Sequence, residues 1–179
     1  MMHSICTHTG KKFDYLDVKP EDICIADIAH GLSNLCRYFG QCKRFYSVAE
    51  HCVKLSLAEN MSGDPKARFL HDAVEAYIGD IARPLKALLP EYRRIEDEIQ
   101  KIIEEKYNVD FSTVKQGDTE ILEIEATVIM PEEFFKISNE ENDFKIYPHP
   151  NTYVEIECWP PFSAEQMFLQ RAFELGVTD

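Results

Sequence analysis

The strongest constraint on the fold is a succession of segments in which apolar residues recur every third or fourth position. Such segments cover residues 22–36, 47–55, 64–77, 91–107, 113–130 and a final stretch from residue 163. This period is typical of amphipathic helices that bury one face. A shorter helix is expected between Pro84 and Pro90. The sequence therefore predicts an all-α fold, a compact helical bundle.

Individual residues predict where several of these helices begin and end. Asp22 is expected to cap the first helix, and Ser47 the second, with Glu50 at the position that completes a capping box. Pro65 suits the first turn of the third helix, and Gly79 suits its end. These signals place residues 71–77 within a single helix.

Two regions depart from the helical pattern. Residues 5–18 predict a short N-terminal hairpin that leads into a loop at Pro20. Residues 136–162 contain four prolines and several aromatic residues without a clear helical period, which predicts an irregular loop. There is no internal repeat and no low-complexity linker, so residues 1–179 are expected to form a single domain.

The net charge of -13 is unevenly distributed along the chain. Residues 1–94 carry 13 Lys/Arg and 12 Asp/Glu, whereas residues 95–179 carry 6 and 20. A chain this acidic lacks the positive surface that binds long nucleic acid. Basic residues near residues 71–72 are still suited to a small anion such as a nucleotide: Arg37, Lys43, Arg44, Arg83, Lys86, Arg93 and Arg94.

The cysteines and the N-terminus indicate the compartment. The six cysteines form no CxxC pair, and Cys24 and Cys36 lie among apolar residues, as small core residues do. No apolar run reaches the length of a membrane span, and the first residues do not resemble a signal peptide. We therefore expect a reduced, cytoplasmic protein without a membrane partner.

The residues with the clearest chemical meaning lie around His71 and Asp72. On a helix, Glu75 shares their face, and a polar trio among apolar neighbours is costly to bury without a partner. A metal ion would be such a partner. His51 adds a second imidazole and Asp118 a second carboxylate. This mixed nitrogen and oxygen set suits a divalent transition ion and leaves positions open for water and substrate.

Each of these residues also has a plainer interpretation. His71 and Asp72 can form an ordinary surface hydrogen bond, and His51 can be a core histidine with its polar atoms satisfied. Asp118 can cap a helix, and Glu125 can be a solvated helix residue. Taken alone, each residue leaves its interpretation open. The order and spacing of the set favour the metal site.

In this order the motifs resemble those of the HD-domain phosphohydrolases. The resemblance is closest to the compact branch with bacterial 5′-deoxynucleotidases and phage-encoded deoxynucleoside triphosphate hydrolases. The matching segments are DIAH (27–30), CRY (36–38), YSVAEH (46–51), HDAVEAYIGD (71–80), RPLK (83–86) and IECW (156–159), together with Asp118. They span nearly the whole chain and imply an HD-domain helical bundle.

The resemblance also implies roles for single residues. It implies one divalent transition metal ion (Zn, Mn, Co, Fe or Ni) on His51, His71, Asp72 and Asp118. Glu75 is then the catalytic carboxylate, Arg37 and Lys86 contact phosphate, and Tyr38 lies beside the sugar. Gln41 stands where the family usually has a histidine, which leaves contacts on that side of the pocket open. Members of this branch form homo-oligomers, so a homo-oligomer is expected.

Phosphate ester hydrolysis assigns chemistry to the same residues. Glu75 would orient the attacking water or protonate the departing 5′-oxygen. Arg37 and Lys86, and with them Arg83, would neutralise phosphate charge. Asp80 is either a further carboxylate that orients the substrate or a residue of the turn after the helix.

The leading functional hypothesis is hydrolysis of a deoxynucleoside triphosphate of the dATP type to deoxynucleoside and triphosphate. Basic residues after the HD segment favour this longer phosphate chain. A 5′-deoxynucleotidase that releases phosphate from monophosphates is the alternative within the same class. A catalytically silent nucleotide-binding module is an alternative from another class. A phosphodiesterase of cyclic or oligomeric nucleotides is less favoured, because no second histidine-rich segment for a two-metal site is evident.

Overall fold

The computed structural model describes residues 3–59, 61–141 and 154–179 of the chain. Helices dominate these residues: α1 (Ile25–Asn34), α2 (Val48–Leu57), α3 (Pro65–Leu70), α4 (Glu75–Ile78), α5 (Arg83–Lys86), α6 (Pro90–Tyr107), α7 (Lys115–Ile129), α8 (Glu133–Glu141) and α9 (Pro161–Glu174). Short 3₁₀ helices are found at Pro20–Asp22, Arg37–Gly40 and Phe111–Thr113. The all-α prediction is confirmed. Among these described helices, none combines the length and apolar character needed to cross a bilayer.

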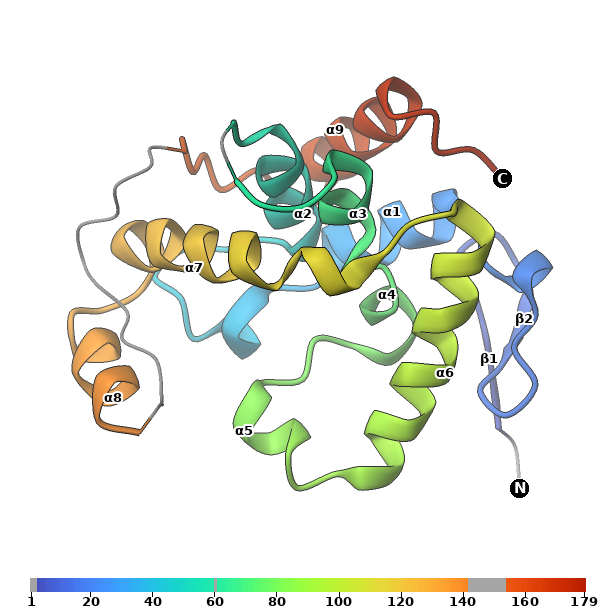
Figure 1. The fold of residues 1–179 in the computed structure, drawn as a ribbon, viewed down its shortest axis with the longest axis horizontal. Coiled ribbons are helices and arrows are strands. Elements are labelled where there is room, and N and C mark those ends of the chain that lie inside the picture. The colour runs from blue at the N-terminus through green and yellow to red at the C-terminus, as the bar shows by residue number, and fades with distance from the viewer. Residues whose placement is uncertain (1–2, 60, 142–153) are drawn as a thin grey trace.

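The predicted hairpin is present at the N-terminus. Strand β1 (Ser4–Cys6) pairs antiparallel with β2 (Lys12–Asp14), beside α6 (Figure 1). Phe13 of β2 is fully buried and stacks on Tyr77 with ring centroids 4.2 Å apart. The hairpin is therefore anchored in the main core by one aromatic side chain.

Two clusters of buried apolar residues hold the helices together. In the larger one, α1, α2, α3 and α9 pack on one another, with Phe69 of α3 against Phe168 of α9 at 4.2 Å between ring centroids. The smaller cluster lies under α7, which runs across one face of the molecule (Figure 1), and includes Ile121 and Leu55. Helix α2 contributes to both clusters, because Val48 lies in the first and Leu55 in the second. It is the central element of the fold.

The helix predicted over residues 64–77 is interrupted. Helix α3 ends at Leu70, and α4 begins at Glu75. The turn between them has the i→i+3 hydrogen bonds of a tighter coil, from Ala73 N–H to Leu70 O (2.9 Å) and from Glu75 N–H to Asp72 O (2.9 Å). His71 and Asp72 thus stand in a turn rather than on a regular α-helix. Gly79, with φ of 85°, ends α4 as predicted.

Three other predictions of local structure need correction. Residues 136–141 belong to α8 rather than to a loop, and the Phe134 ring of this helix packs edge to face with Tyr38. Residues 142–153 of the predicted loop lie outside the described residues. Helix α9 starts at Pro161, two residues before Ser163. Asp22 ends a separate 3₁₀ helix, where its carboxylate accepts the Lys19 N–H, and α1 begins only at Ile25.

Candidate metal centre

Four side chains converge from three parts of the fold. His51 comes from α2, His71 and Asp72 come from the turn between α3 and α4, and Asp118 comes from the first turn of α7. Ligand atoms of His51, His71 and Asp72 all lie within 4.8 Å of one another. The Asp118 Oδ1 lies 3.4 Å from His51 Nε2 and 3.7 Å from His71 Nε2. The predicted ligand set is therefore close together in space.

The spacing of these atoms fits a transition metal ion. Ligands bound tetrahedrally at about 2.0–2.2 Å from an ion lie about 3.3–3.6 Å from one another. The two Nε2 atoms are 3.3 Å apart, and His71 Nε2 is 3.2 Å from Asp72 Oδ1. The other oxygen of Asp72 lies 3.5 Å from His51 Nε2. These residues can hold a divalent ion with only small movements of the side chains.

The outward nitrogen of each imidazole is held by a fixed partner. His51 Nδ1 lies 2.6 Å from Glu125 Oε1, and His71 Nδ1 lies 2.9 Å from the Arg68 carbonyl oxygen. Both partners accept, so each Nδ1 carries a proton and each Nε2 faces the centre, where it can bind an ion by giving up a proton. Such outer partners orient metal-binding histidines and increase their basicity.

Glu125 is a further candidate residue of the site, which its sequence pattern alone does not predict. Its side chain is 0% exposed, and its Oε1 also accepts the Tyr46 hydroxyl proton at 2.8 Å. It is therefore not the solvated helix residue considered among the alternatives. One signal was present in the sequence, because Glu125 follows Asp118 by seven residues. That spacing is two turns of α7 and puts both carboxylates on one face.

The acidic side chains fall into two groups with opposite pKa shifts. Burial alone would raise the pKa of Asp72, but the adjacent imidazoles outweigh it and lower that pKa to about 2. Burial opposes ionisation of Asp118 as well, yet hydrogen bonds with both histidines hold its pKa well below the usual value. Both predicted ligands are therefore charged at neutral pH, as a metal ion requires.

Glu75 behaves in the opposite way. Burial, and then the negative charges of Asp72 and Asp80, raise the pKa of Glu75 well above its ordinary value. Its Oε2 is buried and has no hydrogen-bond partner among the described residues. Burial is also the largest cause that raises the pKa of Asp80. The site therefore contains two carboxylates with a lowered pKa, as metal ligands have, and a carboxyl with a raised pKa, as a general acid has. Opposite pKa shifts within one site are typical of acid–base catalysis.

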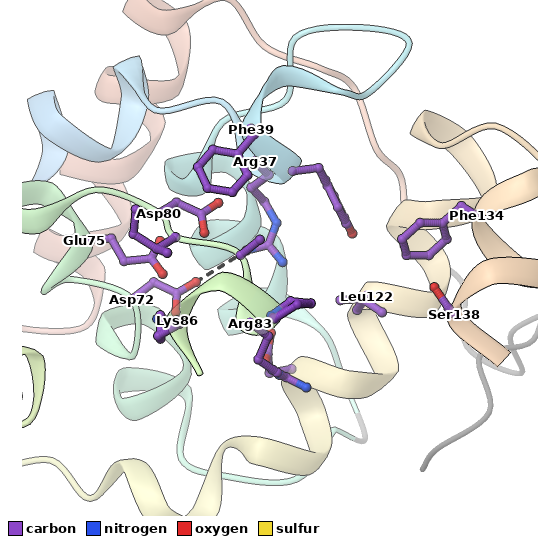
Figure 2. A pocket seen from close by; sticks show the side chains of 15 residues that line it. Arg37, Phe39, Asp72, Glu75, Asp80, Arg83, Lys86, Leu122, Phe134 and Ser138 are labelled. Carbon is purple, nitrogen blue, oxygen red and sulfur yellow. Dashed lines mark hydrogen bonds and ion pairs between the residues drawn. The ribbon is translucent and has the colours of Figure 1, made fainter. Parts of the chain in front are cut away.

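A cavity of about 340 Å³ opens beside the centre. Figure 2 shows Asp72, Glu75 and Asp80 gathered on one side of it, with Phe134 and Ser138 on the opposite side. Eight of the ten predicted site residues line this cavity: Arg37, Tyr38, Asp72, Glu75, Asp80, Arg83, Lys86 and Asp118. The remaining two are the histidines, of which His51 is fully buried. A volume of this size suits a small-molecule ligand.

The predicted phosphate-binding cations all have acidic neighbours. The Arg37 guanidinium lies 3.4 Å from Asp72 Oδ2 and 3.4 Å from Glu125 Oε2. It therefore bridges the predicted ligand Asp72 and Glu125, the hydrogen-bond partner of His51. A terminal nitrogen of Arg83 lies 3.6 Å from Asp118 Oδ2, and its side chain is 61% exposed. Lys86 Nζ contacts a carboxylate of α6 at 2.6 Å. A phosphate group bound here would compete with these pairs.

Tyr38 occupies a strained position in the cavity wall. Its φ is 55°, which is rare for a residue with a side chain. Its hydroxyl is buried without a hydrogen-bond partner in the part of the chain that the structure describes. Its ring stands nearly perpendicular to that of Phe134, with the ring centroids 5.9 Å apart. Strain of this kind persists where the surroundings fix the residue, which is common at binding sites.

Comparisons with known proteins give relatives but no activity. No family model matches the sequence. The chain is 46% identical over 108 residues to the uncharacterized protein YfdR of Escherichia coli (strain K12). The aligned part covers 60% of each protein. It is 34% identical over 110 residues to the uncharacterized protein RCAP_rcc00048 of Rhodobacter capsulatus, and here the aligned part covers 56% of each protein. The match therefore spans less than two thirds of either relative.

Proposed function

We propose that the protein is a metal-dependent phosphohydrolase of deoxynucleotides. In the proposed reaction, a deoxynucleoside triphosphate of the dATP type is hydrolysed to deoxynucleoside and triphosphate. The observation that carries this proposal is the convergence of His51, His71, Asp72 and Asp118 beside a cavity lined by basic and aromatic residues. The protonated carboxyl expected for Glu75 in the same wall adds the acid that the reaction needs.

The four ligands supply the place for the ion. When bound there, a divalent transition ion would polarise a phosphoryl oxygen and lower the pKa of a water molecule. The donor set supports this assignment, because both imidazoles present Nε2 and both carboxylates are ionised at neutral pH. The positive charge of Arg37 beside Asp72 would bind a phosphoryl oxygen on the cavity side.

Glu75 is assigned the proton transfer. When water adds to the α-phosphorus and the bond to the 5′-oxygen breaks, that oxygen leaves with a negative charge unless it is protonated. A carboxyl whose pKa is raised well above its ordinary value keeps its proton to higher pH and can give it to the 5′-oxygen. Asp80, also lining the cavity, can then exchange a proton with Glu75 or orient the sugar.

The space around the centre supports the triphosphate over the monophosphate. A second cavity of about 260 Å³ shares Asp72, Glu75, Lys86 and Asp118 with the first. Its other lining residues are His71, Glu96, Gln100 and Lys115 together with Val74, Phe111 and Val114, whereas the first cavity has Tyr38, Phe39 and Phe134. The nucleoside would occupy the aromatic side, and a longer phosphate chain would extend into the polar side.

Tyr38 is assigned the selection of deoxyribose, through steric exclusion of a 2′-hydroxyl. Native protein should have a higher kcat/KM for a deoxynucleotide than for the matching ribonucleotide, and Tyr38→Ala should reduce this ratio about tenfold or more. Tyr38→Phe keeps the ring and is the matched control, which should keep the preference. Equal kcat/KM for both sugars in the native protein would contradict the assignment.

A product screen tests the proposed reaction. The protein is incubated with all common deoxy- and ribonucleoside mono- and triphosphates, each with Mn²⁺, Co²⁺, Zn²⁺, Fe²⁺ or Ni²⁺, and products are separated by ion exchange. Release of triphosphate from a deoxynucleotide is the expected result. Release of phosphate from monophosphates alone would assign a 5′-deoxynucleotidase instead. No turnover of any substrate would indicate a silent nucleotide-binding module and overturn the proposal.

A further inference from the structure

A second cluster of possible metal ligands lies outside the cavity. It joins His8 of the hairpin turn, His30 of α1 and Glu165 of α9. Each residue offers a ligand atom within 4.8 Å of those of the other two. None of the three lines either cavity of the candidate metal centre. The cluster therefore needs an explanation of its own.

The side chains of this cluster already contact one another. The rings of His8 and His30 are stacked, with centroids 3.7 Å apart and planes inclined by 11°. His30 Nδ1 lies 3.2 Å from Glu165 Oε2. Atoms bound to one transition ion at about 2.0–2.2 Å can be at most about 4.4 Å apart. Rotation of the exposed His8 ring and shifts of a few tenths of an ångström would therefore suffice to bind an ion.

Hydrogen bonds to a buried carboxylate fix the hairpin turn that carries His8. The backbone N–H and the hydroxyl of Thr9 donate to the two carboxylate oxygens of Asp27 at 2.7 and 2.9 Å. Asp27 is only 4% exposed and precedes His30 by three residues on α1. The neighbour of His8 is thus tied to the helix that carries His30. Much of the ordering that a metal site requires is already present without the ion.

We propose that His8, His30 and Glu165 form a second, surface site for a divalent transition ion. Two imidazoles and one carboxylate are a donor set that zinc, nickel and copper(II) favour, with the exposed side left to water. Bound there, an ion would link the N-terminal hairpin, α1 and the C-terminal helix α9. Its role would be structural, because the three ligands come from three separate elements of the fold.

The site is tested by zinc binding in a protein whose candidate catalytic centre has been disabled. In the His71→Ala/Asp72→Ala background, isothermal titration should detect about one Zn²⁺ per chain. Because an ion that binds only the folded state stabilises it, saturating Zn²⁺ should raise the Tm by about 5–10 °C. Adding His8→Ala or Glu165→Gln should abolish both effects. The matched control His3→Ala, on the same hairpin but outside the cluster, should keep them.

A second measurement covers the case in which the background variant does not fold. Metal-stripped native protein should bind one Zn²⁺ more per chain than the single variants His8→Ala and Glu165→Gln. Zinc stoichiometry and thermal response that are the same in native and variant proteins would overturn the proposal. The readout is binding rather than hydrolysis, so this result is independent of whether the phosphohydrolase assignment holds.

Discussion

Two adjacent residues of α2 are both buried, but their polar groups meet different partners. The Glu50 carboxylate accepts the backbone N–H groups of residues 157, 158 and 159 at 2.9, 3.0 and 2.6 Å. His51 instead points its Nε2 at the side chains of His71, Asp72 and Asp118. Both residues are 0% exposed, so burial alone does not distinguish them.

The difference lies in their partners. Glu50 meets backbone amides, which do not titrate in the physiological pH range, and it anchors the segment before α9 to α2. His51 meets ionisable side chains from other elements that border a cavity. A buried charge satisfied by backbone is typical of structure, whereas buried charges that converge and remain partly unsatisfied are typical of a site. The comparison predicts that substitutions in the two regions will affect different quantities.

The largest effect is expected at Glu75, in the region of the cavity. Glu75→Gln should reduce kcat for the preferred deoxynucleotide about 10²–10⁴-fold, or about 3–5 kcal/mol of barrier, because it removes the transferable proton. Metal content, measured by elemental analysis, should be unchanged. A variant within a few-fold of native kcat would contradict the role of Glu75, and loss of the metal would make Glu75 a ligand instead.

In the structural region, Glu50→Ala should lower stability rather than chemistry. It leaves three N–H groups without their acceptor, at a cost of about 3 kcal/mol, or about 6–12 °C in Tm. Thermal unfolding and kcat at low temperature are measured together. Glu155→Ala, an exposed change in the same segment, is the matched control. An unchanged Tm with lost activity would reverse the assignment of the two regions.

Glu125 should behave as part of the site although it does not face the cavity. Glu125→Gln weakens the bond that orients His51, which we expect to reduce metal affinity or activity about 10–100-fold. Metal titration of the stripped protein separates the two effects. Glu105→Gln on the exposed face of α6 should change neither. Native affinity and activity in Glu125→Gln would show that Glu125 only fills the core.

The smallest effect concerns the pH dependence of stability. The pKa of Glu75 is higher in the folded state than its usual value of about 4.3 when unfolded. Its contribution to stability is therefore complete below that value and is lost as the pH rises towards the folded pKa. Metal-free Glu75→Gln should thus unfold a few degrees above native protein at pH 8, with the difference shrinking near pH 4.5. A difference independent of pH would contradict the shift.

Much of the fold and the ligand set could be predicted from the sequence. Helices α6 and α7 have a regular apolar period, and the ligands are recognisable by residue type and order. Glu125 was not recognised, because its burial depends on how α7 packs against α2. Helix α8 is short, and its packing through Phe134 and Phe135 on the smaller cluster and on Tyr38 depends on the tertiary structure. The sequence predicts helix through the turn at His71, since over four residues the periods of i→i+3 and i→i+4 bonding differ too little to be distinguished.

The most direct test of the central claim is the metal dependence of hydrolysis at this centre. Protein stripped by a chelator is titrated with Mn²⁺ or Co²⁺, and the release of triphosphate from dATP and the other deoxynucleoside triphosphates is followed. Activity should be absent without metal and rise to saturation with it, and His71→Ala should stay inactive at every concentration while His3→Ala behaves as native. Full activity in the stripped protein, or in His71→Ala, would contradict the account.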